Sequence, residues 1–380
     1  MKSLLKVNNL RISFCRDSQW QEAVHGVDFE VFEGKTLGIV GESGSGKSVS
    51  NLAVMQLLDR RKSRIESDSI LLEDKDISHY NDDQMSEVRG KQIAMIFQEP
   101  MTSLNPVYKC GFQVMEAFGW QKTKGKGQKT LGMRCLSLSK AKTGTSTGSV
   151  TSQLKSQQHS NTATQQHKEK VLELFEKVKL PNPEIIFDKY PHELSGGQKQ
   201  LLSLASVMIS DPDILILDEP TSQLDPIAAA DFLALLGKIN RELGTTIILT
   251  EHRLEEAFPF ATRVIVMDEG TIICDDKPEN VGLQLRDRGS GMFLAMPTAM
   301  RVWAAVETKL SCPMTVRDGS SFLSQRVDEQ ALLPLAEKEH PTYPDEVTLE
   351  CDDLWFRYEK DSPDVVKGFS LKLRKGEFYA

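Results

Sequence analysis

Long apolar runs are absent from this sequence of 380 residues. No stretch approaches the roughly 20 consecutive apolar residues that a helix needs to span a bilayer. The first residues, Met1 to Lys6, lack the apolar core of a signal peptide and lead directly into a strand-like pattern. If the protein works at a membrane, we therefore expect it to dock onto another subunit.

Paired cysteines and an excess of basic residues are also missing. The formal net charge is -8, which argues against nucleic acid as the main partner because phosphate backbones favour basic surfaces. Scattered cysteines favour reduced thiols over a disulfide framework or a zinc site. The cysteines are Cys15, Cys110, Cys135, Cys274, Cys312 and Cys351.

Acidic residues are missing from one stretch of the chain, between Ala117 and Lys168. Within it, residues 121–166 are rich in Lys, Gln, Ser, Thr and Gly and show almost no apolar periodicity. Such a segment buries too little apolar surface to offset its ordering entropy, so we predict a flexible, solvated insertion. A basic patch that contacts lipid headgroups is the alternative.

The rest of the first 280 residues alternates strand-like and helical patterns. Short apolar runs bounded by turn signals are typical of strands, and those covered on both faces are typical of a parallel sheet. Strand–helix alternation predicts an α/β fold. The expected strands are Leu5–Phe14, Gly26–Phe32, Thr36–Val40, Gln92–Phe97, Ile214–Leu217, Thr246–Thr250 and Val264–Met267, and the expected helices are 47–58, 167–178, 198–209, 226–243 and 254–260.

The sequence also contains an internal repeat. Residues 5–14 resemble residues 349–358, and residues 24–34 resemble residues 366–376. We therefore divide the chain into a first domain at 1–280, a linker or C-terminal extension at 281–346 and the start of a second copy at 347–380. So short a copy cannot build its own core, so we predict that 347–380 is poorly ordered or packs opportunistically.

A glycine-rich segment from Gly41 to Ser48 follows one predicted strand and opens a helix. It reads Gly-Glu-Ser-Gly-Ser-Gly-Lys-Ser, which matches the phosphate-loop pattern G-x-x-x-x-G-K-[ST]. Glycines let successive backbone N–H groups point at phosphate oxygens, and the helix adds its positive end. We expect Lys47 to reach the β- and γ-phosphates and Ser48 to ligate Mg²⁺. The predicted nucleotide-binding residues here are Gly41, Ser43, Gly44, Gly46, Lys47, Ser48 and Val49.

Two carboxylates end the apolar strand at 214–217. In a parallel sheet, Asp218 lies at the carboxyl edge beside the phosphate loop, where it can hold Mg²⁺ through water. The adjacent Glu219 can orient or deprotonate an attacking water. Farther upstream, Ser195 is a good N-cap at the start of a predicted helix, and the free N–H groups there favour an anion.

The order and spacing of these motifs resemble the ABC transporter ATPases. The resemblance covers residues 1–118 and 168–275 and depends on 41–48, Gln98, 194–198, 214–219, 222–225 and His252. It implies a P-loop NTPase fold of the ABC type, with a RecA-like core, an antiparallel β subdomain and a helical subdomain. It also implies ATP and Mg²⁺ as cofactors.

The resemblance implies a role for each matching residue. Phe14 resembles the aromatic that stacks on adenine, although a core aromatic on a strand is the alternative. Gln98 resembles the glutamine that contacts Mg²⁺ or water, and His252 resembles the histidine that contacts the γ-phosphate. The segment 222–225 resembles the loop that follows the catalytic glutamate. Ser195, Gly196, Gly197 and Gln198 resemble the signature that binds the γ-phosphate of ATP held by an opposite subunit.

The family's mechanism implies partners as well. Two such domains, identical or different, meet head to tail with each ATP between one phosphate loop and the other domain's signature. Closure moves transmembrane permease subunits, so the resemblance implies a cytoplasmic subunit held peripherally on the inner face of the cell membrane. A non-transport ABC ATPase and an inactive truncated fragment are the alternatives.

The match is uneven along the chain. Residues 41–48 and 97–106 resemble the importers of dipeptides, oligopeptides and glutathione, whereas the chain from Tyr190 onward resembles the energy-coupling factor ATPases for vitamins and metal ions. Leu201 stands where the family usually has Arg, which we expect to weaken the signature helix. The substrate class therefore stays open at this point.

Overall fold

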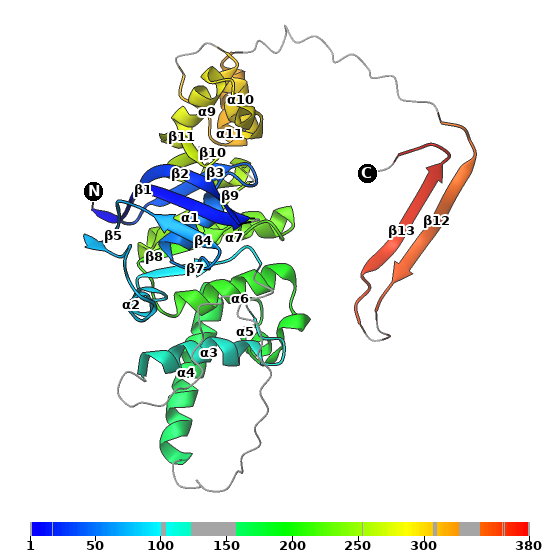
Figure 1. The fold of residues 1–380 in the computed structure, drawn as a ribbon. Coiled ribbons are helices and arrows are strands. Elements are labelled where there is room, and N and C mark those ends of the chain that lie inside the picture. Colours follow the sequence, from blue (N-terminus) through cyan, green and yellow to red (C-terminus); the bar gives the residue numbers. More distant parts are fainter. Residues whose placement is uncertain are drawn as a thin grey trace. The chain divides into compact units, whose positions relative to one another are not determined.

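The computed structural model describes residues 2–16, 18–99, 104–122, 157–252, 254–306, 310–326, 343–358, 360 and 362–378. These residues divide into two units, Met1–Arg326 and Val327–Ala380. Each unit is described by itself (Figure 1).

A six-stranded sheet forms the centre of the first unit. Its order is β11-β10-β3-β9-β8-β7, and every pairing except β10–β11 is parallel. Every residue of the four neighbouring strands β3, β9, β8 and β7 is buried, as expected for apolar strands covered on both faces. The α/β prediction is therefore confirmed. The strands are β3 (Thr36–Gly41), β7 (Ile93–Ile96), β8 (Ile214–Asp218), β9 (Thr246–Glu251), β10 (Arg263–Asp268) and β11 (Thr271–Asp276).

An antiparallel sheet packs beside the central one. Its order is β2-β1-β5-β6, and β4 also pairs with β1. A cluster of buried apolar side chains from both sheets, including Leu5, Ile12, Ile39 and Ile216, fills the space between them. The elements of this part are β1 (Ser3–Arg16), β2 (Gln19–Phe32), β4 (Ser63–Glu66), β5 (Ser69–Leu72), β6 (Lys75–Asp76), α1 (Lys47–Val54) and α2 (Asp82–Val88).

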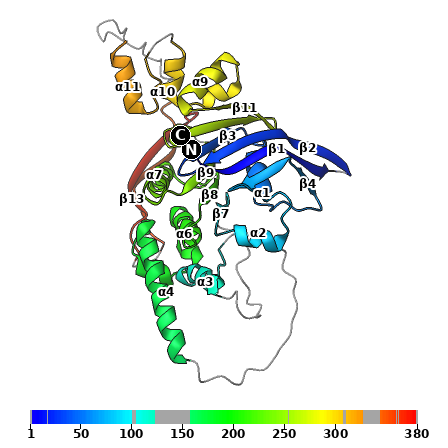
Figure 2. The same cartoon turned by 90° about the vertical axis from the view of Figure 1, so that its left-hand side faces the viewer.

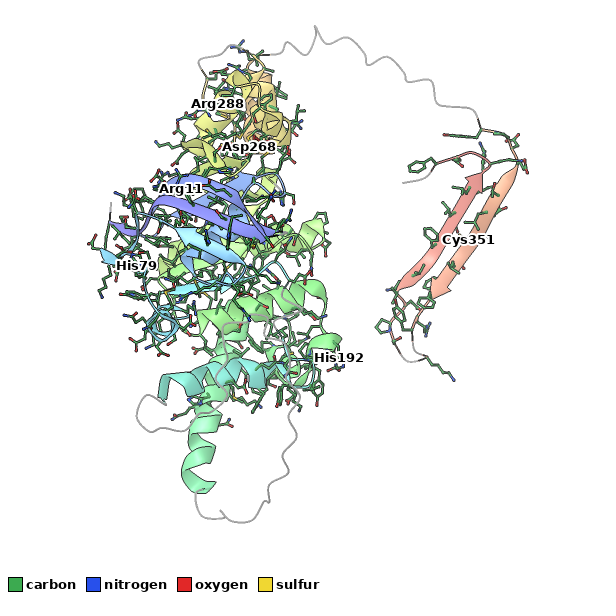
Figure 3. The ribbon with its side chains drawn as sticks, viewed as in Figure 1. Arg11, His79, His192, Asp268, Arg288 and Cys351 are labelled. Atoms are coloured by element: carbon green, nitrogen blue, oxygen red, sulfur yellow. The ribbon has the colours of Figure 1, made fainter. Side chains whose placement is uncertain are left out.

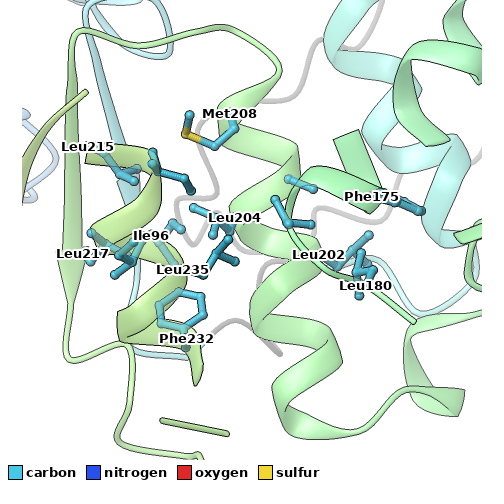
Figure 4. Packing of buried hydrophobic residues seen from close by; sticks show 14 of the residues in the cluster. Ile96, Phe175, Leu180, Leu202, Leu204, Met208, Leu215, Leu217, Phe232 and Leu235 are labelled. Carbon is cyan, nitrogen blue, oxygen red and sulfur yellow. The ribbon is translucent and has the colours of Figure 1, made fainter. Parts of the chain in front are cut away.

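Helices α3 to α6 gather at one end of the first unit (Figures 1 and 2). They are α3 (Cys110–Lys122), α4 (Gln157–Lys177), α5 (Pro183–Asp188) and α6 (Gly196–Met208), with the 3₁₀ turn Pro191–Glu193 before α6. Figure 4 shows how the core holds α6: Leu204 and Met208 lie with Leu215 and Leu217 of β8, whereas Leu202 lies with Phe175 of α4. The central sheet and the helical end therefore share one core through α6.

The predicted insertion is partly wrong. Helix α4 begins at Gln157 rather than His167, so residues 157–166 of the predicted flexible segment are helical. They contain neither Gly nor Pro, the residues that most disfavour a helix, so the helix extends upstream. Residues 123–156 of that prediction lie outside the described residues.

Helices α9 (Pro278–Asp287), α10 (Thr298–Ala304) and α11 (Val316–Ser324) lie at the end of this unit opposite α3 and α4 (Figure 2). Val281 and Leu285 of α9 and Met300 of α10 share a buried cluster with β10 and β11. Helix α11 packs in turn on α10 through Phe322 and Trp303. The described residues up to 326 in the predicted linker or extension are thus part of the first unit. Helices α7 (Pro226–Leu243) and α8 (Leu254–Ala257) complete this unit. No helix among the described residues is long and apolar enough to cross a membrane.

The second unit is a hairpin of β12 (Val347–Phe356) and β13 (Val366–Arg374). Its register matches that of β1 and β2: Leu349 pairs with Leu373 as Leu5 pairs with Val31, and the ladder shifts after Cys351 as it does after Val7. Figure 3 shows Cys351 on β12.

The environments of the two hairpins differ. Leu5 is 0% exposed, whereas its counterpart Leu349 is 53% exposed. The described part of 347–380 is a regular hairpin, which differs from the poor order that was one of the two predicted outcomes. Opportunistic packing, the other predicted outcome, stays a prediction for this hairpin. Its apolar side chains remain mostly exposed, as expected for a copy without a core of its own.

Candidate nucleotide site at the carboxyl edge of the parallel sheet

Four neighbouring strands end at one edge of the central sheet and deliver the predicted site residues. The phosphate loop follows β3, His252 follows β9, Asp218 ends β8 and Gln98 follows β7. In open parallel sheets, ligands bind beyond the carboxyl ends of the strands. Residues far apart in sequence thus reach one site because their strands are neighbours.

The phosphate loop adopts a backbone that requires glycine. Gly46 is the N-cap of α1 with a φ of 102°, in the region that L side chains rarely adopt. At Gly41, an added Cβ would lie 2.2 Å from the carbonyl oxygen of Met267. The loop therefore passes close to β10 and leads into the helix N-terminus, an arrangement suited to phosphate oxygens. Ser43 and Gly44 of this loop are exposed, and Ser48 and Val49 in the first turn of α1 are half-buried.

The Lys47 side chain lies folded within this loop. Its Nζ donates hydrogen bonds of 2.8 Å to the carbonyl oxygens of Gly41 and Glu42. Burial lowers the pKa of Lys47, and the carboxylates of Glu219 and Asp218 oppose this shift. Lys47 is thus a buried group whose Nζ donates to the loop carbonyls.

Asp218 accepts two hydrogen bonds through the same oxygen. The hydroxyls of Ser48 and Thr250 each lie 2.7 Å from its Oδ1. These oxygens fit Mg²⁺, which in nucleotide sites uses one or two carboxylates together with substrate phosphates and water. Ser48 and Asp218 are the paired side chains that would hold it, and its charge would offset that of the phosphates. The predicted metal contact of Gln98 stays a prediction.

Glu219 is held on both sides of its carboxylate. Gln98 Nε2 donates to Oε2 over 2.6 Å, and His252 Nε2 lies 2.7 Å from Oε1. The Glu219 backbone has a φ of 45°, and such strain in a non-glycine residue persists where surrounding contacts fix it, often at functional sites. The structure therefore brings together the three residues predicted to be catalytic.

The predicted adenine contact lies on β1, and the predicted signature lies at the start of α6. Phe14 is half-buried on β1 against the cluster between the two sheets, which is compatible with both roles considered for it. Ser195 caps α6: its Oγ accepts from the N–H of Gln198, whose side chain in turn accepts from the N–H of Ser195. Among the described residues, no hydrogen bond joins 195–198 to the phosphate loop. The roles of Phe14 and of Ser195, Gly196, Gly197 and Gln198 stay predictions.

Comparison with known proteins agrees with this geometry. The family model described as ABC transporter matches residues 24–222. The oligopeptide transport ATP-binding protein AppD of Bacillus subtilis is 33% identical over 298 residues, which cover 78% of this chain and 79% of that protein.

The chain belongs to the ABC transporter family. The glutathione import ATP-binding protein GsiA of Escherichia coli is also similar to this ABC ATPase, with 33% identity over 71% of this chain but only 38% of that protein. A dimeric ATP-binding cassette in a post-hydrolysis state, bound to ADP and Pi, matches 72% of this chain and 99% of its own at a TM-score of 0.55. Its identity of 22% makes this a likeness of fold.

Sequence reasoning missed two residues of this ABC ATPase site. Thr250 donates to Asp218 from β9, and Glu251 accepts from the backbone beyond Glu219. Both are polar side chains that are at most 2% exposed. The signal was present, because both end an otherwise apolar strand next to His252.

Leu201, the departure within the signature helix, is accommodated by the fold. It is half-buried and packs against the core cluster that holds α6. Leucine is also a strong helix former. Nothing in this packing indicates a weakened helix.

Glu251 leads to a prediction about stability. Burial raises its pKa to about 7 from an ordinary 4.5, and the Glu219 charge adds to this shift, whereas hydrogen bonds from Thr221 and His252 oppose it. Between pH 4.5 and about pH 7, the folded chain binds more protons at Glu251 than the unfolded chain does, so the stability of the folded chain falls as pH rises. From pH 4 to pH 8, the free energy of unfolding of Glu251→Gln should therefore rise by about 3 kcal/mol relative to that of wild type, because glutamine does not titrate.

Urea unfolding of both proteins at these two pH values measures this difference. Glu255→Gln is the matched control: hydrogen bonds from Thr298 lower the pKa of Glu255, so it should show no such gain. An equal difference between Glu251→Gln and wild type at both pH values would contradict the prediction.

Proposed function

We propose that this ATPase powers an importer of peptide-class solutes. In the proposed arrangement, it lies at the inner face of the cell membrane, docks onto transmembrane permease subunits and pairs with a second ATPase domain. The names of its relatives AppD and GsiA, an oligopeptide transporter and a glutathione importer, support the solute class. The dimeric fold neighbour supports the pairing.

One observation carries the chemical part of the proposal: Glu219 lies between Gln98 and His252, beside the Ser48–Asp218 pair. A carboxylate so placed can orient or deprotonate the water that attacks the γ-phosphate. His252 would contact the γ-phosphate. The backbone of 41–48 and Lys47 would hold the β- and γ-phosphates, so that positioning and charge stabilisation lower the barrier.

The remaining roles concern binding. Phe14 would stack on adenine. Residues 195–198 would contact the γ-phosphate of the ATP bound by the second domain, because the N-terminus of α6 offers N–H groups suited to an anion. Closure of two such sites would move the permease subunits, and hydrolysis would reopen them.

The test is uptake of labelled peptides by cells of the source organism in which the gene for this chain has been deleted. We expect uptake to be lost, to return with the wild-type chain and to stay lost with Glu219→Gln. Uptake of a free amino acid in the same cells is the control. Unchanged peptide uptake in cells without the chain would contradict the proposed solute class.

A further inference from the structure

Glu251 is a buried carboxylate whose two oxygens bind different segments. Its Oε1 accepts from the backbone N–H of Thr221 over 3.0 Å, and its Oε2 accepts from the N–H of His252 over 3.3 Å. Thr221 lies in the turn that follows Glu219. A single side chain at the end of β9 thus connects the backbone of both segments that carry the proposed catalytic pair.

The turn that carries Glu219 is attached to β9 on both sides. Before Pro220, the N–H of Glu219 donates to Thr250, with its carbonyl oxygen at 3.0 Å and its Oγ1 at 3.1 Å. After Pro220, the N–H of Thr221 donates to Glu251. Because Glu219 has a strained φ of 45°, these two attachments fix a backbone that would otherwise relax.

This position is an unfavourable one for a carboxylate. Glu251 is 2% exposed, and no salt bridge to it is found in the part of the chain that the structure describes. An isolated buried charge costs stability unless hydrogen bonds compensate for it. An apolar residue would fill the same space without this cost, so packing alone does not account for a carboxylate here.

We propose that Glu251 is a positioning residue for ATP hydrolysis, which fixes the Glu219 turn relative to His252. This inference rests on the proposed roles of Glu219 and His252. The contact that it maintains is the 2.7 Å approach of His252 Nε2 to Glu219 Oε1. Glu251 acts from behind this pair and needs no contact with the nucleotide. The phosphate loop and Lys47 are outside its reach through these contacts, so ATP binding should depend on it little.

The test separates turnover from binding in Glu251→Gln. Glutamine has the same volume, but one oxygen becomes an NH₂ group that faces a backbone N–H donor. The turn or His252 must then shift, and a displacement of about 1 Å lowers catalysis by up to about 10²-fold. We expect kcat to fall by about 10- to 100-fold while KM for ATP changes by less than about 3-fold.

Two further variants complete the experiment. Glu251→Asp retains two acceptor oxygens one methylene farther back, so it should recover part of the lost kcat. Glu255→Gln, which removes a carboxylate that accepts from the N–H of Thr298, should leave kcat unchanged. Circular dichroism identifies any variant that does not fold. If Glu251→Gln does not fold, Glu251→Asp decides the test, because reduced kcat at unchanged KM in that variant supports the inference.

Wild-type kcat in folded Glu251→Gln would overturn the inference. The inference would also be overturned if Glu251→Gln changed kcat and KM together and Glu251→Asp recovered no activity, because that is the result a merely structural role predicts. A failure of the proposed function is distinguishable, because the wild-type chain itself would then not hydrolyse Mg-ATP, or Glu219→Gln would hydrolyse it at the wild-type rate.

Discussion

Glu219→Gln is expected to lower the rate of ATP hydrolysis by about 10²- to 10⁴-fold, the usual contribution of a general base. Glutamine keeps the volume and one acceptor oxygen, but it cannot take a proton from water. ATP affinity should stay close to wild type, because Lys47 and the loop backbone are unchanged. Phosphate release and equilibrium binding of a fluorescent ATP analogue measure the two quantities.

The matched control for this variant is Glu242→Gln. Glu242 lies at the exposed end of α7 and forms an i,i+4 ion pair with Lys238 at 3.7 Å, which contributes little to stability. Its rate should equal that of wild type. Wild-type turnover in Glu219→Gln would remove Glu219 from the mechanism and direct attention to another group near the γ-phosphate.

Lys47→Ala is expected to abolish ATP hydrolysis, because the charge that stabilises the γ-phosphate is lost, and also to weaken ATP binding. Lys47 is 3% exposed and its Nζ already donates to two carbonyl oxygens of the loop, so its loss leaves phosphate charge uncompensated. Hydrogen bonds to charged groups contribute about 1.5–3 kcal/mol, which corresponds to an affinity lower by about 10- to 100-fold. Titration of the ATP analogue at low ionic strength measures this loss.

Lys238→Ala is the control for the removal of a lysine, because Lys238 is exposed on α7. It should bind the analogue as wild type does. If Lys47→Ala folds and still turns over ATP at the wild-type rate, the assignment of 41–48 as the phosphate loop is wrong. This variant therefore tests binding, whereas Glu219→Gln tests chemistry.

The sequence was sufficient to predict how the site is assembled from its strands. Short apolar runs bounded by turns predict buried parallel strands, and the motifs follow those runs directly. Because parallel strands end at one edge, Asp218 was expected beside the phosphate loop. The roles of Gln98 and His252 were implied only by the resemblance to ABC ATPases. The repeat predicted that 347–380 copies the start of the first domain, but the regular hairpin of β12 and β13 was not predicted.

Other features were beyond sequence reasoning because they depend on tertiary contacts. The φ of 45° at Glu219 results from attachments to Thr250 and Glu251, which are more than thirty residues away along the chain. Nor does a local pattern state that Thr250 shares the Asp218 oxygen with Ser48. The early start of α4 was missed because a polar composition predicted a loop where helix propensity prevailed.

In the proposed mechanism, one chain's signature completes another domain's ATP site. The most direct measurement is the solution mass of Glu219→Gln, by size-exclusion chromatography with light scattering, with and without Mg-ATP. We expect a monomer without nucleotide and a dimer with Mg-ATP, and no such change in Lys47→Ala. A protein that binds ATP and stays monomeric would contradict pairing of this chain with itself, and the required partner would then be a different ATPase domain.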